Sequence, residues 1–301
     1  MDGFNQQFIY SILIIGLGYL LKQTKIIKES DGEGLARLIF NLTLPSLIVV
    51  TFSDIVIEPS LFFLVIAAII AGFFFVSIGL FVFRNEQNST RGMLLMMIPG
   101  YNVGLFAYPL VEGLWGAEGI KYFGMFDVGN AFIVFGLSYL MGSFYASEET
   151  KITTKEITLK LVKSIPLMTY MIVFLLNIIH IPLPNVLIDT ASIISGANMP
   201  LSLLLLGIYL NFTFDKKYLY LVGKFLVARF GVGLLIGIAL FVWLPVDLMF
   251  RYTLLIALIL PTSMSLLPYA VEFGYDKKFV GTVSNITMLL SFFLIWLIIN
   301  I

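Results

Sequence analysis

The sequence predicts an all-α polytopic membrane protein with ten transmembrane helices, and three observations point to this fold class. Of its 301 residues, 59% are apolar and 12% are charged, and the mean hydropathy is +1.00. Water-soluble domains are about 45–50% apolar and about 25% charged. The apolar residues gather in runs of roughly 20, which is the length that a helix needs to cross a bilayer. Ten such runs with short connections use up the chain and leave no room for a soluble domain.

Charged residues or Pro and Gly interrupt the apolar runs and set the bounds of each expected helix. The first run has neither a basic start nor a small-residue cleavage site, so we expect it to be a mature span. A polar link at about 145–159 separates the fifth run from the sixth. The ten expected helices lie at about 5–22, 33–53, 60–83, 91–111, 119–143, 160–180, 186–212, 217–243, 246–271 and 278–300.

The distribution of Lys and Arg predicts how these helices are oriented, because short cytoplasmic loops retain cations. The loops after helices 2, 4, 6 and 8 hold 2 cations, Lys121 and Arg251. The loops after helices 1, 3, 5, 7 and 9 hold 13: Lys22, Lys25, Lys28, Arg84, Arg91, Lys151, Lys155, Lys160, Lys163, Lys216, Lys217, Lys277 and Lys278. We therefore expect both termini outside a cell (plasma) membrane. An even number of spans independently requires both termini to lie on the same side.

The composition and motifs exclude several functions. The 18 Lys and Arg balance 18 Asp and Glu, so nothing indicates a nucleic-acid partner. Thiol catalysis, iron–sulfur clusters and the usual structural zinc sites are excluded by the lack of Cys and by a single His, His180. The sequence has no His-Glu-x-x-His, Gly-x-Ser-x-Gly or Walker motif, so we expect neither an enzyme nor an ATPase. We expect no cofactor and no metal.

The two halves of the chain resemble an inverted repeat. Each half has five spans, an odd number, so the second half enters the membrane from the opposite side. With a constant offset of 160, residues 91–112 align with 251–272, and both stretches contain two prolines. A second echo pairs Leu44-Pro45-Ser46-Leu47 with Met199-Pro200-Leu201-Ser202.

Helices 4 and 9 carry matched helix-breaking sequences. Helix 4 reads Ile-Pro-Gly-Tyr-Asn-Val-Gly over residues 98–104, and helix 9 reads Leu-Pro-Thr-Ser-Met-Ser-Leu-Leu-Pro over residues 260–268. Proline removes a backbone donor, and the freed carbonyls need partners within the membrane. Matched interruptions in two halves indicate a transporter's binding site, and half-helix N-termini suit an anion. For either helix alone, a simple kink is the rival interpretation.

The same residues resemble the auxin efflux carrier family, which includes plant PIN proteins and bacterial malate and malonate permeases. The matching motifs are Asn-Leu-Thr-Leu-Pro-Ser-Leu-Ile at 41–48, Pro-Gly-Tyr-Asn-Val-Gly-Leu-Phe-Ala-Tyr-Pro-Leu at 99–110, Ser-Gly-Ala-Asn-Met-Pro at 195–200 and Leu-Pro at 260–261. The resemblance implies a bile acid sodium symporter-like fold, with two inverted five-helix repeats in which broken helices 4 and 9 cross. The chain lacks the long cytoplasmic loop of plant PINs, which fits a prokaryotic member and makes auxin doubtful as the natural substrate.

The resemblance also implies that the chain is divided into two functional domains. A scaffold would comprise residues 1–56 and 160–213, and a mobile transport domain residues 57–147 and 214–301, joined by a cytoplasmic linker at 148–159. Asn102 corresponds to the family's crossover asparagine and would contact the substrate carboxylate. A homodimer through the scaffold helices is expected. The full set of expected substrate-binding residues is Asn41, Gly100, Tyr101, Asn102, Pro261, Thr262, Ser263 and Met264.

Two charged residues are expected near the middle of the membrane, where charges are usually paired or functional. Asp127 is interpreted as a proton or cation site and Arg229 as a substrate-anion contact, or the two form a structural ion pair. Asn130 lies one turn from Asp127, and we expect it to take part with Asp127 and Arg229 in coupling or charge pairing.

Other polar residues have weaker interpretations. The oxygens of Asn130, Ser284, Asn285 and Thr287 would line a cavity, coordinate Na⁺, or simply form hydrogen bonds between helices. Glu112 and Glu272 are expected at helix ends as solvated carboxylates, with Glu272 able to reach the crossing if helix 9 is broken, and His180 is expected at the membrane interface.

Four functions remain in competition. The favoured one is a secondary transporter of small organic anions, such as malate, malonate or auxin-like acids, that works by elevator-type alternating access. A Na⁺-coupled organic anion symporter on the same fold is next. A membrane-embedded enzyme lacks its catalytic motifs, and a receptor or structural protein would not need matched helix breaks.

Overall fold

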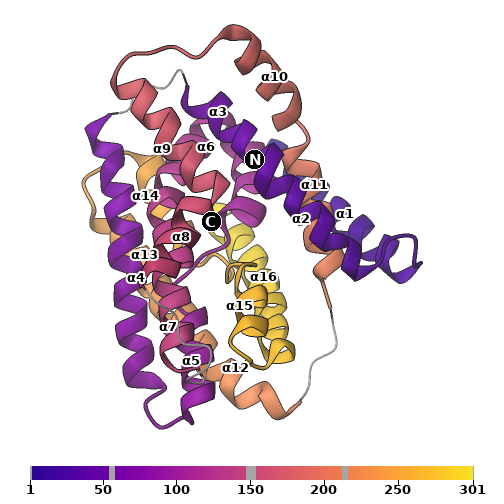
Figure 1. Cartoon of the computed structure of the whole chain (residues 1–301), viewed down its shortest axis with the longest axis vertical. Coiled ribbons are helices and arrows are strands. Elements are labelled where there is room, and N and C mark those ends of the chain that lie inside the picture. Colours follow the sequence, from indigo (N-terminus) through magenta and orange to yellow (C-terminus); the bar gives the residue numbers. More distant parts are fainter. Residues whose placement is uncertain (1, 54–57, 147–153, 212–215, 301) are drawn as a thin grey trace. The chain divides into compact units, whose positions relative to one another are not determined.

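The computed structural model describes residues 2–53, 58–146, 154–211 and 216–300, and the regular secondary structure of these residues is helical (Figure 1). Four of the segments, η2, η4, η5 and η8, are π-helical. The elements are α1 (Asp2–Gln23), η1 (Glu29–Asp31), α2 (Gly32–Leu38), η2 (Ile39–Thr43), α3 (Leu44–Phe52), η3 (Pro59–Leu61), α4 (Phe62–Val82), α5 (Asn88–Met97), η4 (Val103–Ala107), α6 (Tyr108–Phe132), η5 (Ile133–Ser138), α7 (Tyr139–Phe144), α8 (Thr154–Lys163), α9 (Ile165–Ile178), α10 (Asn185–Ser195), α11 (Asn198–Tyr209), η7 (Lys216–Tyr218), α12 (Leu219–Leu226), η8 (Val227–Gly231), α13 (Val232–Trp243), α14 (Leu248–Ala257), α15 (Leu266–Glu272) and α16 (Lys277–Asn300).

The all-α membrane class is confirmed by the length and composition of these helices. Among the described residues, 6 helical stretches are long and apolar enough to cross a membrane: Glu29–Phe52, Pro59–Val82, Val103–Phe144, Asn185–Tyr209, Lys216–Trp243 and Lys277–Asn300. Ile165–Ile178 and Leu248–Ala257 are shorter apolar helices. Ten membrane crossings in two inverted repeats stay a prediction.

Two helix boundaries differ from those expected, and a third is confirmed. Helix 6 begins at Ile165 rather than at 160, because the Ser164 side chain accepts a hydrogen bond from the Leu167 N–H and caps the helix there. The run expected as one helix over 186–212 is interrupted at residues 196–197, because Pro200 has no N–H for the carbonyl of Gly196. The separation expected between helices 4 and 5 is present as a sharp break inside α6 at Gly116, whose φ of 59° and ψ of −141° suit glycine. The ring of Trp115 before the break stacks on that of Phe123 after it at 6.4 Å.

Contacts within the chain divide it into two compact units. Unit 1 comprises residues 1–61, 103–124 and 162–210, and unit 2 comprises residues 62–102, 125–161 and 211–301. The expected linker at 148–159 falls partly outside the described residues, as do Lys151 and the domain boundaries expected at 56/57, 147/148 and 213/214.

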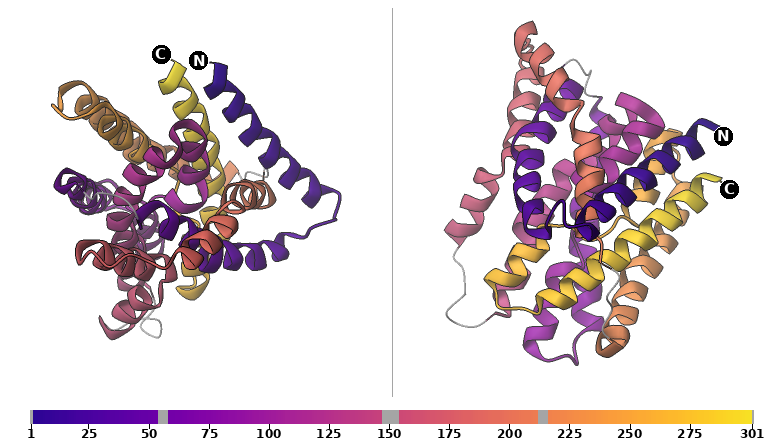
Figure 2. Two further views of the ribbon diagram at one scale, coloured as in Figure 1. Left: turned by 90° about the horizontal axis from the view of Figure 1, so that it is seen from above. Right: turned by 90° about the vertical axis from the view of Figure 1, so that its right-hand side faces the viewer.

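Unit 1 is built around two helix contacts. In the first, α1 packs closely against α11 (Figure 2), and a Cβ atom at Gly207 would lie 2.0 Å from the carbonyl oxygen of Ile15. In the second, α9 and α10 pack against α3, where the ring of Phe52 meets the rings of Tyr170 and Phe174 edge-on at 5.6 and 5.2 Å. Small residues and aromatic rings thus hold unit 1 together.

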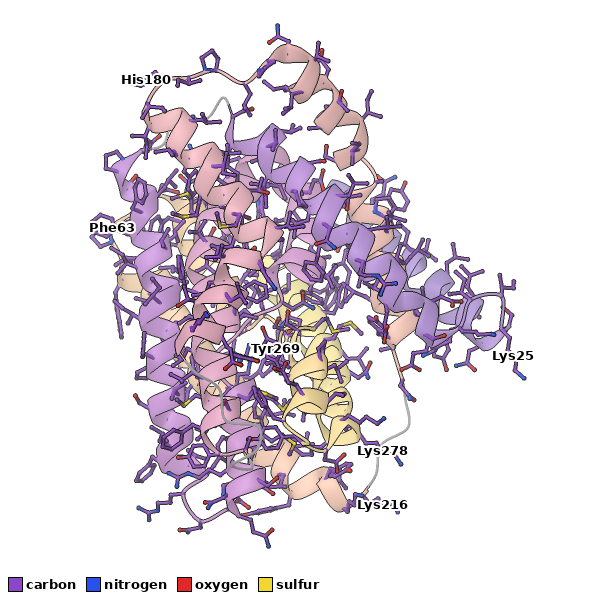
Figure 3. All side chains as sticks on the ribbon, viewed as in Figure 1. Lys25, Phe63, His180, Lys216, Tyr269 and Lys278 are labelled. Carbon is purple, nitrogen blue, oxygen red and sulfur yellow. The ribbon has the colours of Figure 1, made fainter. Side chains whose placement is uncertain are left out.

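Unit 2 contains α4, α5, α7 and α12–α16. Within it α13 packs against α14, α5 against α7 and α15 against α16. Tyr269 on α15 lies inside the unit (Figure 3), where its ring meets that of Tyr139 on α7 at 4.9 Å. Phe63 projects outward from α4 and is 64% exposed, as expected of a side chain that faces lipid.

Candidate functional site

The candidate site lies in unit 2, where both of the expected helix breaks are present. α5 ends at Met97 and α14 ends at Ala257, and each is followed by non-helical backbone before the next helix begins. Pro99 and Pro261 lie in these segments, and neither can donate a backbone hydrogen bond that would continue the helix. We call residues 98–102 and 258–265 together the crossing.

The two segments of the crossing are hydrogen-bonded to each other. Tyr101 and Thr262 form an isolated antiparallel bridge, the only extended pairing among the described residues. The N–H of Asn102 donates to the carbonyl oxygen of Pro261 at 2.9 Å. Residues about 160 positions apart in the sequence are therefore neighbours in this unit.

The side chain of Asn130 on α6 supplies partners for the first segment. Asn130 is 3% exposed, and its Oδ1 accepts from the N–H of Tyr101 at 2.9 Å while its Nδ2 donates to the carbonyl of Tyr101 at 3.0 Å. The same Nδ2 lies 3.0 Å from Oδ1 of Asp127. One amide thus satisfies both backbone groups of Tyr101 and links them to a carboxylate inside the span.

Hydroxyl groups on α16 supply partners for the second segment. The hydroxyl of Thr262 donates to that of Ser284 at 3.1 Å, and the N–H of Thr262 donates to Thr287 Oγ1 at 3.3 Å. One turn further on, Ser291 Oγ donates to the carbonyl of Ile259 at 2.6 Å. The sequence indicated Ser284 and Thr287 as polar lining, but it gave no signal for Ser291.

Arg229 lies at the crossing and is fully buried. Its guanidinium donates to backbone carbonyls of both segments: to Ile98, to Gly100 at 2.8 Å, to Leu260 at 3.3 Å and to Pro261 at 3.5 Å. The guanidinium carbon also lies 4.4 Å from the centre of the Tyr101 ring. Neither interpretation of Arg229 from the sequence, anion contact or partner of Asp127, anticipated these carbonyls.

The other expected binding residues are distributed unevenly. Gly100, Tyr101, Asn102, Pro261, Thr262 and Ser263 are buried in the crossing, and Met264 is half-buried beside them. Asn41 belongs to unit 1 and is exposed on η2. Two positions along, Thr43 is buried and its hydroxyl donates to Oδ1 of Asn198 on α11 at 2.9 Å, a pair that the sequence did not indicate.

The remaining candidates have ordinary surroundings. Asn285 donates to the carbonyl of Gly281 within α16, and His180 is exposed at the end of α9. Glu272 is exposed and accepts a hydrogen bond from the hydroxyl of Tyr139. Glu112 is less solvated than expected, because its Oε2 is buried without a hydrogen-bond partner among the described residues.

Asp276 begins the last helix, in the turn between α15 and α16. Its Oδ1 accepts from the N–H groups of Lys278 and Phe279 at 3.0 and 3.2 Å, and its Oδ2 accepts from the hydroxyl of Tyr218. Burial alone would raise the pKa of Asp276, but these hydrogen bonds and the nearby Lys217 outweigh it and hold the pKa below its usual range. Asp276 is therefore a charged N-cap.

The chemistry available at the crossing is that of neutral amides, hydroxyls and one fixed cation. Among the described residues, no group of three His, Asp or Glu side chains comes together to hold a metal ion. Amide and hydroxyl groups can bind a small polar ligand through hydrogen bonds, and buried donors are effective partners for a carboxylate. Nothing in this set resembles a nucleophile with an adjacent base.

Comparison with known proteins places these features in a wider group. Residues 6–299 match the family described as "Membrane transport protein". A protein of Methanothermobacter thermautotrophicus named "Uncharacterized transporter" is 25% identical over 223 residues, which cover 70% of each chain. A second uncharacterized transporter, from Methanocaldococcus jannaschii, is 24% identical over 306 residues, which cover 96% of this chain and 97% of the relative.

Proposed function

This chain belongs to the membrane transport protein family, the auxin efflux carrier-like group that its motifs resemble, and on that premise we propose that it is a secondary transporter of small organic anions. The family and the names of the relatives identify a transporter rather than an enzyme. The observation that carries the proposal is the crossing, where two broken helices are bonded to each other inside a membrane unit.

The composition of the crossing favours an anion as substrate. Irregular backbone at membrane depth is tolerated where it is buried in protein or lines a cavity, and transporter sites are built from such helix breaks. Asn102, Thr262 and Ser263 supply neutral donors there, and Arg229 adds a positive charge nearby. In this proposal Asn102 binds the substrate carboxylate, with Gly100, Tyr101, Pro261 and Met264 shaping the site.

The proposed mechanism is elevator-type alternating access in the plasma membrane. In it, ten helices form two inverted repeats, both termini are extracytoplasmic, and a scaffold dimer carries a moving transport domain in each protomer. The two contact units support this division, since unit 2 holds the crossing and unit 1 holds α1–α3 and α9–α11. The units differ from the proposed domain bounds chiefly at residues 103–124, which belong to unit 1, and by two to five residues at three other boundaries.

Asp127 and Asn130 are the proposed coupling pair. Asp127 is half-buried and is linked through Asn130 to the backbone of the crossing. Protonation of its carboxylate would therefore change the hydrogen bonding of Asn130 and, through it, of Tyr101. If a proton is the coupled ion, Asp127→Asn loses accumulation driven by a pH gradient but keeps exchange of substrate across the membrane. Uptake that needs Na⁺ instead would favour the symporter, with the hydroxyls of Thr262, Ser284 and Thr287 as its oxygen ligands.

The test is uptake into proteoliposomes of a panel of mono- and dicarboxylates and indole acids, under imposed pH, Na⁺ and voltage gradients. We expect at least one carboxylate to enter faster than into protein-free vesicles. Asn102→Ala should weaken its apparent affinity about tenfold or more, because a hydrogen bond to a charged group is lost. Asn300→Ala, on the exposed end of α16, is the matched control. If no carboxylate is transported, the proposal is wrong.

A second test asks whether the crossing lies on the substrate pathway. The chain has no Cys, so Asn102→Cys and Thr262→Cys each give a single reactive thiol. We expect a membrane-impermeant thiol reagent to label them from one side or the other, at a rate that substrate changes. If neither thiol ever reacts, the substrate passes elsewhere.

A further inference from the structure

Arg229 is the most unusual charge in the described part of the chain. It lies in η8, a π-helical segment inside the apolar stretch Lys216–Trp243, and none of its surface is exposed. Burying a guanidinium is costly unless its N–H groups and its charge are both compensated. Its surroundings should therefore show what compensates it.

The compensation comes from four backbone carbonyls at the two terminal nitrogens, while Nε has no hydrogen-bond partner among the described residues. Two acceptors, Ile98 and Gly100, follow the end of α5, and two, Leu260 and Pro261, follow the end of α14. The C-terminal end of a helix carries a partial negative charge, because its last carbonyls have no partner within the helix. Arg229 thus lies at the negative ends of two half-helices at once.

We propose that Arg229 is a positioning residue that acts as the resident cation of the crossing. Its charge offsets the carbonyl ends of α5 and α14, and its two terminal nitrogens hold both segments in the register in which Asn102 bonds to Pro261. Tyr101 covers the guanidinium from one side at 4.4 Å. A substrate anion would have to compete with these carbonyls for the terminal nitrogens, so Arg229 acts on the substrate through the backbone that it holds.

The chemical consequence is that a small cation can replace the side chain. Arg229→Ala removes the guanidinium and leaves a space lined by the four carbonyls, which free guanidinium has the shape and charge to fill. Arg251 offers a matched control in the same unit, because it is half-buried and donates to the single carbonyl of Phe241 at 3.2 Å.

The test measures thermal unfolding of purified full-length protein in detergent. Arg229→Ala should melt roughly 6 °C or more below wild type, since an uncompensated buried cluster is left behind. Millimolar guanidinium chloride, far below denaturing concentrations, should restore at least about half of that loss. Wild type and Arg251→Ala should not be stabilised by guanidinium, nor Arg229→Ala by the same concentration of urea. Absence of rescue overturns the proposal.

A second variant covers the case in which Arg229→Ala does not fold. Arg229→Lys keeps the charge but offers a single ammonium in place of two nitrogens spread between the segments. Hydrogen–deuterium exchange of the Asn102 amide, which bonds to Pro261, should be at least about tenfold faster than in wild type. Unchanged exchange at Asn102 would show that Arg229 does not hold the two segments together.

Only the transport consequence of this inference rests on the proposed function. Guanidinium should restore carboxylate uptake by Arg229→Ala together with its stability. Rescue of stability in a protein whose wild type carries no carboxylate leaves the role of Arg229 standing and removes the proposed function. If the wild type takes up carboxylates but guanidinium restores neither the stability nor the uptake of Arg229→Ala, the proposed function stands and the role of Arg229 is wrong.

Discussion

Replacing Asn130 by Ala should destabilise the protein through two backbone groups rather than through lost packing. Among the described residues, Asn130 is the only hydrogen-bond partner of the N–H and the carbonyl of Tyr101, at 2.9 and 3.0 Å, and the change also removes the contact with Asp127 at 3.0 Å. Hydrogen bonds between membrane helices average about 0.6 kcal/mol, so three of them give a lower bound of about 2 kcal/mol. Two orphaned buried groups at about 1–3 kcal/mol each give an upper bound of about 6 kcal/mol.

The assay is unfolding in mixed micelles followed by Trp fluorescence, with the melting temperature as a second readout. A loss of about 2 kcal/mol corresponds to a fall of roughly 4 °C or more for a unit of this size. Asn300→Ala serves as the control, because its amide bonds only to a carbonyl within the exposed end of α16. If Asn130→Ala unfolds within about 0.5 kcal/mol of wild type, Tyr101 finds other partners and Asn130 does not support the crossing.

Two further predictions concern the packing and capping of helices. Gly207→Ala should separate α1 from α11 and lower the melting temperature, because the new methyl would lie 2.0 Å from the carbonyl oxygen of Ile15. The control is Gly16→Ala, whose new methyl would have no other atom within 4 Å and should be neutral or stabilising by up to about 1 kcal/mol. Asp276→Ala should cost about 1 kcal/mol through the loss of the α16 N-cap. The lowered pKa of Asp276 means that this contribution is complete above the unfolded-state pKa near 4 and disappears as the pH falls through the lower folded-state value, so wild type and variant should converge in acid. A difference that persists at low pH would contradict the charged N-cap.

The helix breaks were predictable from the sequence where a residue such as proline changes the hydrogen bonding of its own backbone. Pro99 and Pro261 end α5 and α14 because each lacks an N–H, a property that any reader of the sequence can see. The same rule applied to Pro200 would have predicted the interruption before α11, although the apolar run there looks continuous. Local chemistry therefore accounts for the helix breaks that were expected and also for the one that was overlooked.

The site was less predictable, because side chains meet there across long sequence separations. Asn41 and Thr43 lie on a π-helical segment, whose wider turn shifts the faces that an α-helical pattern assigns, and Thr43 rather than Asn41 is the buried residue. The partners of Arg229 cannot be identified from the sequence, because they are main-chain carbonyls, which every residue has. The role of Arg229 could be inferred only once the structure showed which backbone carbonyls lie outside regular helices.

The bonding of Arg229 to carbonyls also has a consequence for how this protein can change over generations. A salt bridge between two side chains constrains both positions, so a loss at one can be repaired by a substitution at the other. The acceptors of Arg229 belong to the main chain, so the contact itself does not depend on which side chains residues 98, 100, 260 and 261 carry, and no substitution among them can compensate for losing the arginine. The pairing should therefore leave no trace as correlated substitutions between Arg229 and the four acceptor positions.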